Sequence, residues 1–245
     1  LSAETAKNKM IPYRKARIRP PRISSLNQVN FANSWKELSV AITEIQNKNA
    51  SNLSFGELYT KAYNMVLRKY GERLYNNVRD QIKGYLLNMH KEIVLAFEYQ
   101  PMVIYLPAVK SDDNDDPNGT LTAIPDDEPI VLLENIERNI NFLKKIVTIW
   151  EDHIFSMKMI SDVLMYLDRV YAKENSLPLV YDFGITLFND YVIAYNDNEI
   201  GGILNEIVTD QFYLTRKKFT TNNENNLSKS VMKMFESIQE DYSAK

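Results

Sequence analysis

The sequence predicts an all-α protein, and three observations lead to that fold class. Only 7 of the 245 residues are glycine, whereas all-β folds need glycine at the positive-φ positions of their many turns. Long stretches repeat apolar residues at the three- and four-residue spacing of a helix, and no strand pattern competes with them. The prolines cluster outside these periodic stretches. A chain of this length can also bury a sizeable core.

The first hundred residues predict an arm followed by three helices. Residues 1–30 hold three prolines and no sustained periodicity, so we expect an extended arm, which carries seven basic residues and one acidic residue. Helices are expected over about 34–48, 55–71 and 72–97. Ser34 with Glu37, and Ser54 with Glu57, match the capping-box pattern, in which each side chain can satisfy a backbone N–H at the start of a helix.

A proline-rich acidic stretch separates these helices from the rest of the chain. Residues 100–129 hold five prolines and seven acidic residues, which predicts a long insertion between helices. One or two helices are expected over 132–175, with a stop enforced by Pro178. Further helices are expected over about 180–195, over about 199–217 and from Leu227 onward, with a polar loop at 220–226.

The residue inventory gives little support for catalysis. The chain has no cysteine, which excludes a thiolate nucleophile and any cysteine-ligated metal. Its two histidines, His90 and His153, are more than sixty residues apart. Glu151 and Asp152 precede His153, but adjacent residues of a helix point in different directions. Phosphate-binding glycine motifs are also missing. We therefore predict no catalytic, cofactor-binding or metal-binding residues, and an enzyme built on His153 is kept only as an alternative.

Charge and hydropathy bound the setting of the protein. No run approaches the roughly 20 apolar residues that a membrane span requires, and the lack of cysteine gives no support for an oxidising compartment. We therefore expect a cytoplasmic or nuclear protein without a membrane partner. The net charge of −3 argues against a nucleic-acid partner. The basic arm is interpreted as a solvated tail, with an import signal or a docking arm as the alternatives.

The helix expected to begin near Phe55 has an unusually wide apolar face. Its core stripe is compact and consists of Leu58, Ala62, Met65 and Val66. Phe55, Tyr59 and Tyr63 follow one another at four-residue steps along one side of that stripe, which widens the arc to roughly 200°. Two interpretations remain open: two neighbouring helices bury both halves, or the tyrosines form an edge for a partner. Tyrosine suits the second use, because it is enriched at interface hot spots.

Three segments, taken in order, resemble the amino-terminal region of the cullin family. The first reads LSFGELY from Leu53, continues as AYNMVL from Ala62 and is followed by GERLY from Gly71. The second reads ISDVLMYLDRVY and ends at Tyr171, and it is similar to the family's fifth helix. The third, at 179–191, is similar to the start of the family's next repeat. Ordered agreement over about 160 residues is specific, whereas one segment alone would not be.

The resemblance implies five-helix cullin repeats, with a first repeat at 31–176 and the beginning of a second at 177–245. It also implies a non-catalytic scaffold of a ubiquitin ligase, whose RING subunit binds only to the full-length protein. KARIR at 15–19 resembles the extension of the cullin-three-like subtype, which partners BTB-domain adaptors, and departures elsewhere suggest a divergent fungal member. The adaptor contacts implied on the second and fifth helices and on the arm are Leu53, Phe55, Tyr59, Tyr63, Asp168, Tyr171 and Ile18.

Two departures from the family pattern bear on the adaptor. Gly56 stands where the family has an acidic residue, so one polar contact is missing, and the acidic insertion is longer than in most members. The preferred adaptor can therefore differ from the usual one, and a Skp- or elongin-like adaptor stays within the interpretation. A helical tether of the vesicle-trafficking kind is the alternative from another class, because such stalks are also helical stacks that are poor in glycine.

Overall fold

The computed structural model describes residues 31–97, 103–104, 130–131, 133–216 and 222–243. It confirms the all-α prediction, since nearly all of these residues are helical. The arm with Ile18 and most of the acidic insertion lie outside the described residues. The helices and helical turns are α1 (Phe31–Gln46), η1 (Ala50–Asn52), α2 (Phe55–Leu67), α3 (Gly71–Ala96), α4 (Leu133–Val163), α5 (Met165–Leu167), η2 (Asp168–Ala172), α6 (Val180–Phe188), η3 (Asn189–Ile193), α7 (Tyr195–Arg216) and α8 (Asn222–Ser243).

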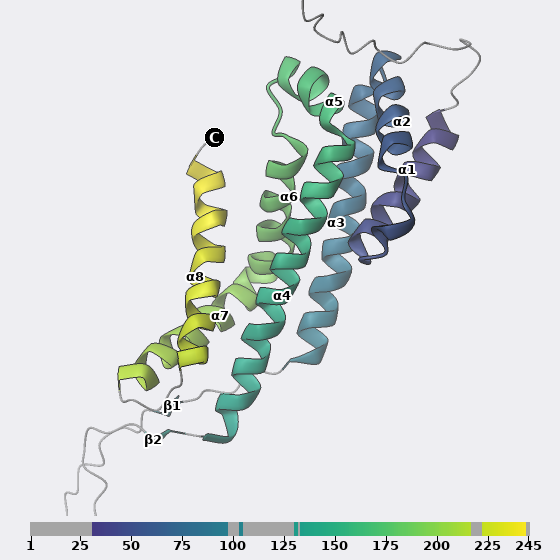
Figure 1. The fold of residues 1–245 in the computed structure, drawn as a ribbon. Helices are drawn as coiled ribbons and strands as arrows, with labels where there is room; N and C mark the ends of the chain where they lie inside the picture. The colour runs from purple at the N-terminus through teal and green to yellow at the C-terminus, as the bar shows by residue number, and fades with distance from the viewer. Residues whose placement is uncertain (1–30, 98–102, 105–129, 132, 217–221, 244–245) are drawn as a thin grey trace, which may run out of the picture.

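The helices form an elongated bundle, in which α4 touches helices on both sides (Figure 1). The α1–α2 pair packs against one side of α4, and α8 packs against the other. Behind α4, α3 and α6 pack against each other, and α7 crosses beside α8. Since α6 and α8 both contact α4, the helices on either side of residue 177 share one continuous apolar core. The repeat boundary at 176/177 stays a prediction.

A short strand pair, which no pattern in the sequence indicated, lies among the helices. Val103–Ile104 (β1) pairs antiparallel with Ile130–Val131 (β2), with Val103 opposite Val131. The pair lies at the end of the bundle where α4 begins (Figure 1). Two residues are too few to show an alternating pattern, so periodicity could not reveal them. Burial of Val103 ties the pair to the core.

The close approach of α6 to α4 depends on a glycine. A Cβ atom placed on Gly184 would lie 2.8 Å from the sulfur of Met157, which is fully buried on α4. Contacts that short essentially never occur, so the side chain of Met157 occupies the space that glycine leaves. The pairing of Met157 with Gly184 therefore fixes the distance between α4 and α6.

Helix boundaries differ from the predicted ones where tertiary contacts decide them. Helix α1 begins at Phe31 rather than Ser34, because the buried Phe31 ring packs 5.4 Å from the ring of Tyr70 and beneath the guanidinium of Arg73, at 4.2 Å. The capping box predicted at Ser34 is therefore wrong, since Ser34 lies inside the helix. Ser54 does precede α2, but its side chain makes no capping hydrogen bond. Helix α8 begins at Asn222, five residues before the predicted start, Leu227.

Among the residues that the structure describes, no helix is both long enough and apolar enough to cross a membrane.

Candidate partner-binding site

Helix α2 buries the stripe that its spacing predicts. Leu58, Ala62, Met65 and Val66 are all buried, which confirms the predicted core stripe. Phe55, the first residue of the helix, is 36% exposed, and Tyr59 and Tyr63 are half-buried. Leu53, just before the helix, is also half-buried and packs on the core. The aromatic residues therefore form a partly exposed border along one side of a well-anchored helix.

The border on α2 continues onto α5. The rings of Tyr59 and Tyr63 stack at 6.2 Å, and the ring of Tyr63 lies 4.3 Å from the ring of Tyr166. We call Tyr59, Tyr63 and Tyr166 the tyrosine surface. Each of the two interpretations left open by the spacing describes part of it: α5 covers one side of Tyr63, while solvent reaches the other. Tyr166 was not selected from the sequence, although it lies in the same MYLDRVY run as Tyr171.

A break in the helix at Leu164 turns Tyr166 toward α2. Leu164 leaves the helical conformation, with φ −98° and ψ 13°, and Leu167 N–H donates to Leu164 O, one residue closer than in an α-helix. A π-helical turn (η2) then carries Asp168 and Tyr171. Such single turns change the phase of a helix and are frequent at functional sites. The break therefore decides which side chains of this segment meet α2.

Asp168 is only 8% exposed, and its carboxylate is used inside the protein. The carboxylate accepts a hydrogen bond from Val180 N–H at 2.9 Å, at the first residue of α6, and another from the Ser161 hydroxyl at 3.4 Å. Burial raises the pKa of Asp168 to about 6, against the opposing effect of these two donors. Asp168 thus joins η2 to the start of α6, which the sequence did not reveal. Its contact with a partner stays a prediction.

Tyr171 lies where η2 approaches the start of α3. Its ring is 5.9 Å from that of Tyr75, and a Cβ atom placed on Gly71 would lie 2.7 Å from it. Gly71 therefore makes room for the Tyr171 ring. Tyr75 in turn donates a hydrogen bond to Pro178 O at 2.8 Å, and burial raises the pKa of Tyr75 to about 12. Tyr171 is half-buried, so part of its surface remains available to a partner.

The predicted contact residues fall into three groups. Tyr59 and Tyr63 meet Tyr166 in the tyrosine surface, whereas Asp168 and Tyr171 lie on the following turn. Leu53 and Phe55 lie at the opposite end of α2. Ile18 lies outside the described residues. The structure therefore brings Tyr59 and Tyr63 to the end of the bundle where α5 lies (Figure 1), but it leaves Leu53 and Phe55 away from that end.

Both histidines are buried and bonded to the backbone. The Nε2–H of His153 donates to Gly184 O at 3.0 Å, and burial lowers the pKa of His153 to about 4. Nδ1 of His90 lies 3.2 Å from Val192 O. Glu151 is exposed on the other side of its helix turn. Among the described residues, no three acidic, histidine or cysteine side chains gather in a way that could hold a metal ion.

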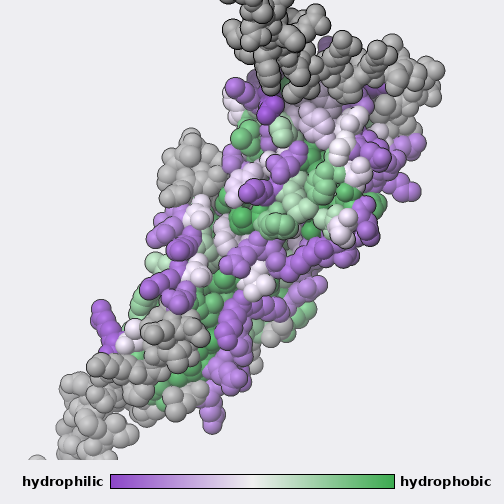
Figure 2. Space-filling model, viewed as in Figure 1, coloured by the Kyte–Doolittle hydropathy of each residue, from purple (hydrophilic) through white to green (hydrophobic). Residues whose placement is uncertain are grey.

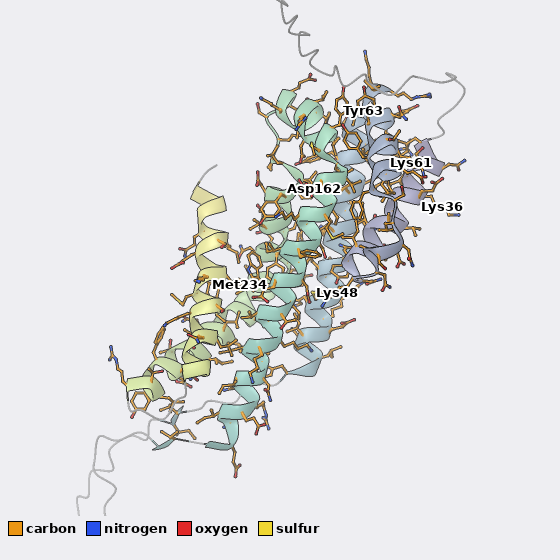
Figure 3. The ribbon with its side chains drawn as sticks, viewed as in Figure 1. Lys36, Lys48, Lys61, Tyr63, Asp162 and Met234 are labelled. Carbon is orange, nitrogen blue, oxygen red and sulfur yellow. The ribbon has the colours of Figure 1, made fainter. Side chains whose placement is uncertain are left out.

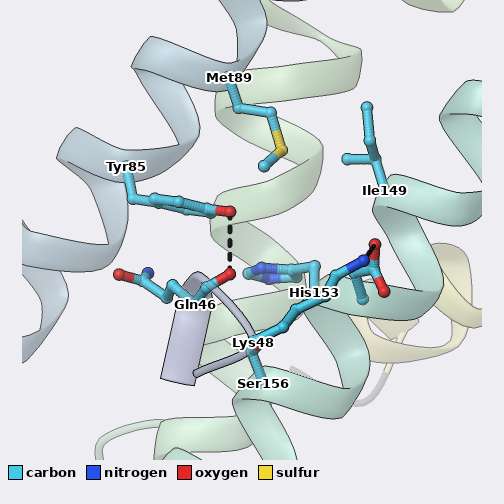
Figure 4. Close-up of a pocket in the computed structure, with 8 residues that line it drawn as sticks. Gln46, Lys48, Tyr85, Met89, Ile149, His153 and Ser156 are labelled. Carbon is cyan, nitrogen blue, oxygen red and sulfur yellow. Dashed lines mark hydrogen bonds and ion pairs between the residues drawn. The ribbon is translucent and has the colours of Figure 1, made fainter. Parts of the chain in front are cut away.

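A small cavity beside His153 is the kind of space a water molecule could fill, not a substrate (Figure 4). Its volume is about 50 Å³, whereas ligand pockets measure roughly 300–1,000 Å³. Tyr85 donates to Gln46 O at 3.3 Å across it, and Lys48 pairs with Asp152 at 2.6 Å. Buried Nε2 of Gln46 has no hydrogen-bond partner. The residues around it are Gln46, Lys48, Tyr85, Met89, Ile149, Asp152, His153 and Ser156.

Comparisons with known proteins agree with the three sequence segments. The family model of the cullin α-solenoid domain matches residues 35–244. Cullin-3 of Schizosaccharomyces pombe is 39% identical over 210 residues, which are 85% of this chain and 25% of that protein. Cullin-3 of Caenorhabditis elegans is 31% identical over 204 residues, 83% of this chain and 21% of that protein. The chain thus spans about a quarter of the length of these relatives.

Proposed function

Because the chain belongs to the cullin family, we propose that it is the adaptor-binding segment of a ubiquitin-ligase scaffold. In this proposal it contributes no catalytic group, and its partner is a BTB-domain adaptor that recruits substrates. The RING subunit would bind only to other parts of the full-length protein, in the cytoplasm or nucleus. The names of the relatives support the BTB class over a Skp- or elongin-like adaptor, since those quoted above are both Cullin-3. No observation favours the vesicle tether.

The tyrosine surface is the observation that carries the proposal. It joins two elements that are separate in sequence, and each tyrosine offers apolar area together with a hydroxyl. Such residues dominate binding energy at interfaces when they are fully desolvated by a partner. The core stripe of α2 fixes the backbone beneath Tyr59 and Tyr63, so little order remains to be gained on binding. A rigid, partly exposed aromatic surface is suited to holding a folded partner.

The proposal is tested by titrating the chain with purified BTB-domain proteins from the same genome in a calorimeter. Tyr59→Ala should weaken the tightest of these complexes by ~2 kcal/mol or more while the thermal midpoint stays near wild type. Tyr63→Ala should also weaken binding, with some loss of stability because Tyr63 supports Tyr166. Phe212→Ala, an exposed aromatic residue on α7, is the matched control and should bind as wild type.

The outcomes separate the function from the site. Failure of the wild-type chain to bind any BTB-domain protein would remove the proposed partner class. Binding that is unchanged in Tyr59→Ala would leave the partner class intact and remove the tyrosine surface as the site. A large fall in the thermal midpoint of Tyr59→Ala would show that this tyrosine supports the fold instead.

A further inference from the structure

Phe155 on α4 is a large apolar side chain that the fold leaves in solvent. It is 65% exposed, while Met157 and Ile160 of the same helix are fully buried. Phe155, Met159 and Asp162 follow at steps of four and three, the spacing of one helical face, and all three lie in α4 before the break at Leu164. Tyr166 belongs to the tyrosine surface, where its ring meets that of Tyr63. Asp152, three residues before Phe155, pairs with Lys48 just after α1, so Phe155 stands near the side of α4 on which α1 and α2 pack.

Contacts between α1 and α4 show where Phe155 lies along the length of the bundle, relative to α2. Ser156 donates to Ile45 O at 3.4 Å, and Asp152 pairs with Lys48, so the end of α1 lies beside this part of α4. Helix α2 begins seven residues after Lys48, packs on α4 and runs in the same direction (Figure 1). A helix rises 1.5 Å per residue along its axis. Measured along the helix axes, Phe155 therefore lies about 16 Å from Tyr166, and Phe55 lies about 12 Å from Tyr63. In both cases the phenylalanine is nearer than the tyrosine to the amino-terminal end of its helix. The two phenylalanines thus stand at similar levels.

The two helices together present one elongated apolar surface. Phe55 and Tyr59 line it from α2, and Phe155 and half-buried Met159 line it from α4. Figure 2 shows hydrophobic residues in green on the face where α2 and α4 lie together, with hydrophilic residues in purple around them. Figure 3 labels Tyr63 on α2 and Asp162 on α4, the polar residue that interrupts the α4 stripe. An apolar surface with a polar rim is typical of a protein interface.

We propose that Phe155 is a second anchor for the adaptor, one that extends the tyrosine surface down α4; this rests on the function proposed above. A stable interface covers about 800 Å² on each partner, a patch roughly 30 Å across. A separation of about 16 Å places Phe155 and Tyr166 under one such footprint. A different protein seated on Phe155 would collide with an adaptor on Tyr59 and Tyr63. The adaptor should therefore present an apolar pocket to Phe155, with a basic group facing Asp162.

The test compares Phe155→Ala with Phe212→Ala in the calorimetric titration described above. Both variants remove an exposed phenylalanine, since Phe212 is 50% exposed, so the cost to the fold should be small and alike. We expect Phe155→Ala to weaken adaptor binding at least tenfold and Phe212→Ala to change it less than twofold. Circular dichroism melting should give thermal midpoints near wild type for both.

Two further measurements keep this inference separate from the proposed function. If Tyr59→Ala weakens binding and Phe155→Ala stays within twofold of wild type, the second anchor is wrong and the adaptor site stands. If the wild-type chain binds no BTB-domain protein, the proposed function fails and the anchor fails with it. Light scattering after size exclusion tests self-association: a wild-type dimer that Phe155→Ala converts to a monomer would assign this surface to a second copy of the chain and overturn the inference.

Discussion

Replacing Asp168 by asparagine should stabilise the protein at neutral pH and should do so in a pH-dependent way. The carboxylate is 8% exposed, and burial raises its pKa from 3.8 to about 6. Since the charged form is disfavoured in the folded state, the wild-type chain loses stability as the pH rises from about 4 to about 6. At about 1.4 kcal/mol per unit, the shift corresponds to roughly 3 kcal/mol at pH 7 and above. Asparagine carries no charge and still offers an oxygen to Val180 N–H.

Urea unfolding at pH 4.5, 6 and 8 measures this effect. The free energy of unfolding of Asp168→Asn, relative to wild type, should increase with pH up to about 6 and then stay level. Asp162→Asn, which removes the charge of an exposed carboxylate on α4, is the matched control for the loss of one negative charge. A wild-type chain that is more stable than Asp168→Asn at pH 8 would refute the reasoning, because the ionised carboxylate would then stabilise the start of α6. Adaptor binding by the same variant separates its internal role from the partner contact that the resemblance implies.

Three glycine substitutions test how closely the helices pack. Gly184→Ala should destabilise the fold by roughly 1–3 kcal/mol in a thermal melt, because its Cβ would lie 2.8 Å from the Met157 sulfur; an unchanged midpoint would contradict this. Gly71→Ala should destabilise the fold by a similar amount, because its Cβ would lie 2.7 Å from the Tyr171 ring. The loss of stability should be smaller when Tyr171 is also replaced by alanine. An equal loss with and without Tyr171 would count against the contact. Gly56→Ala should instead stabilise the fold by up to about 1 kcal/mol and raise the thermal midpoint, because nothing lies within 4 Å of the new Cβ and alanine favours a helix. A lower midpoint would contradict this expectation.

Periodicity predicted what depends on local sequence. The helical stretches and the core stripe of α2 follow from apolar spacing, and they were confirmed residue by residue at Leu58, Ala62, Met65 and Val66. The start of α1 could not be predicted in this way, because Phe31 is drawn into the helix by Tyr70 and Arg73, which lie some forty residues away. A contact between distant residues leaves no mark on the spacing of either segment.

The candidate site was predicted on one side only. The tyrosines of α2 were visible because they share a helix face, whereas Tyr166 meets them through the break at Leu164. That segment contains neither proline nor glycine, so its sequence gives no signal of a break. The same break and the following π-helical turn direct the Asp168 carboxylate toward α6, where it accepts a hydrogen bond from Val180 N–H. Local patterns identify the residue types, but the phase of the helix decides what they touch.

The shared core of α4 has a consequence for how the chain unfolds. Helix α4 contacts α1 and α2 on one side and α6 and α8 on the other, so neither group can detach without exposing apolar surface of α4. A fragment that ends at residue 176, where the predicted first repeat stops, would lose the cover supplied by Phe183, Leu187 and Phe188. The smallest cooperative folding unit is therefore larger than the sequence repeat. Hydrogen exchange should report it as one foldon that spans the repeat boundary.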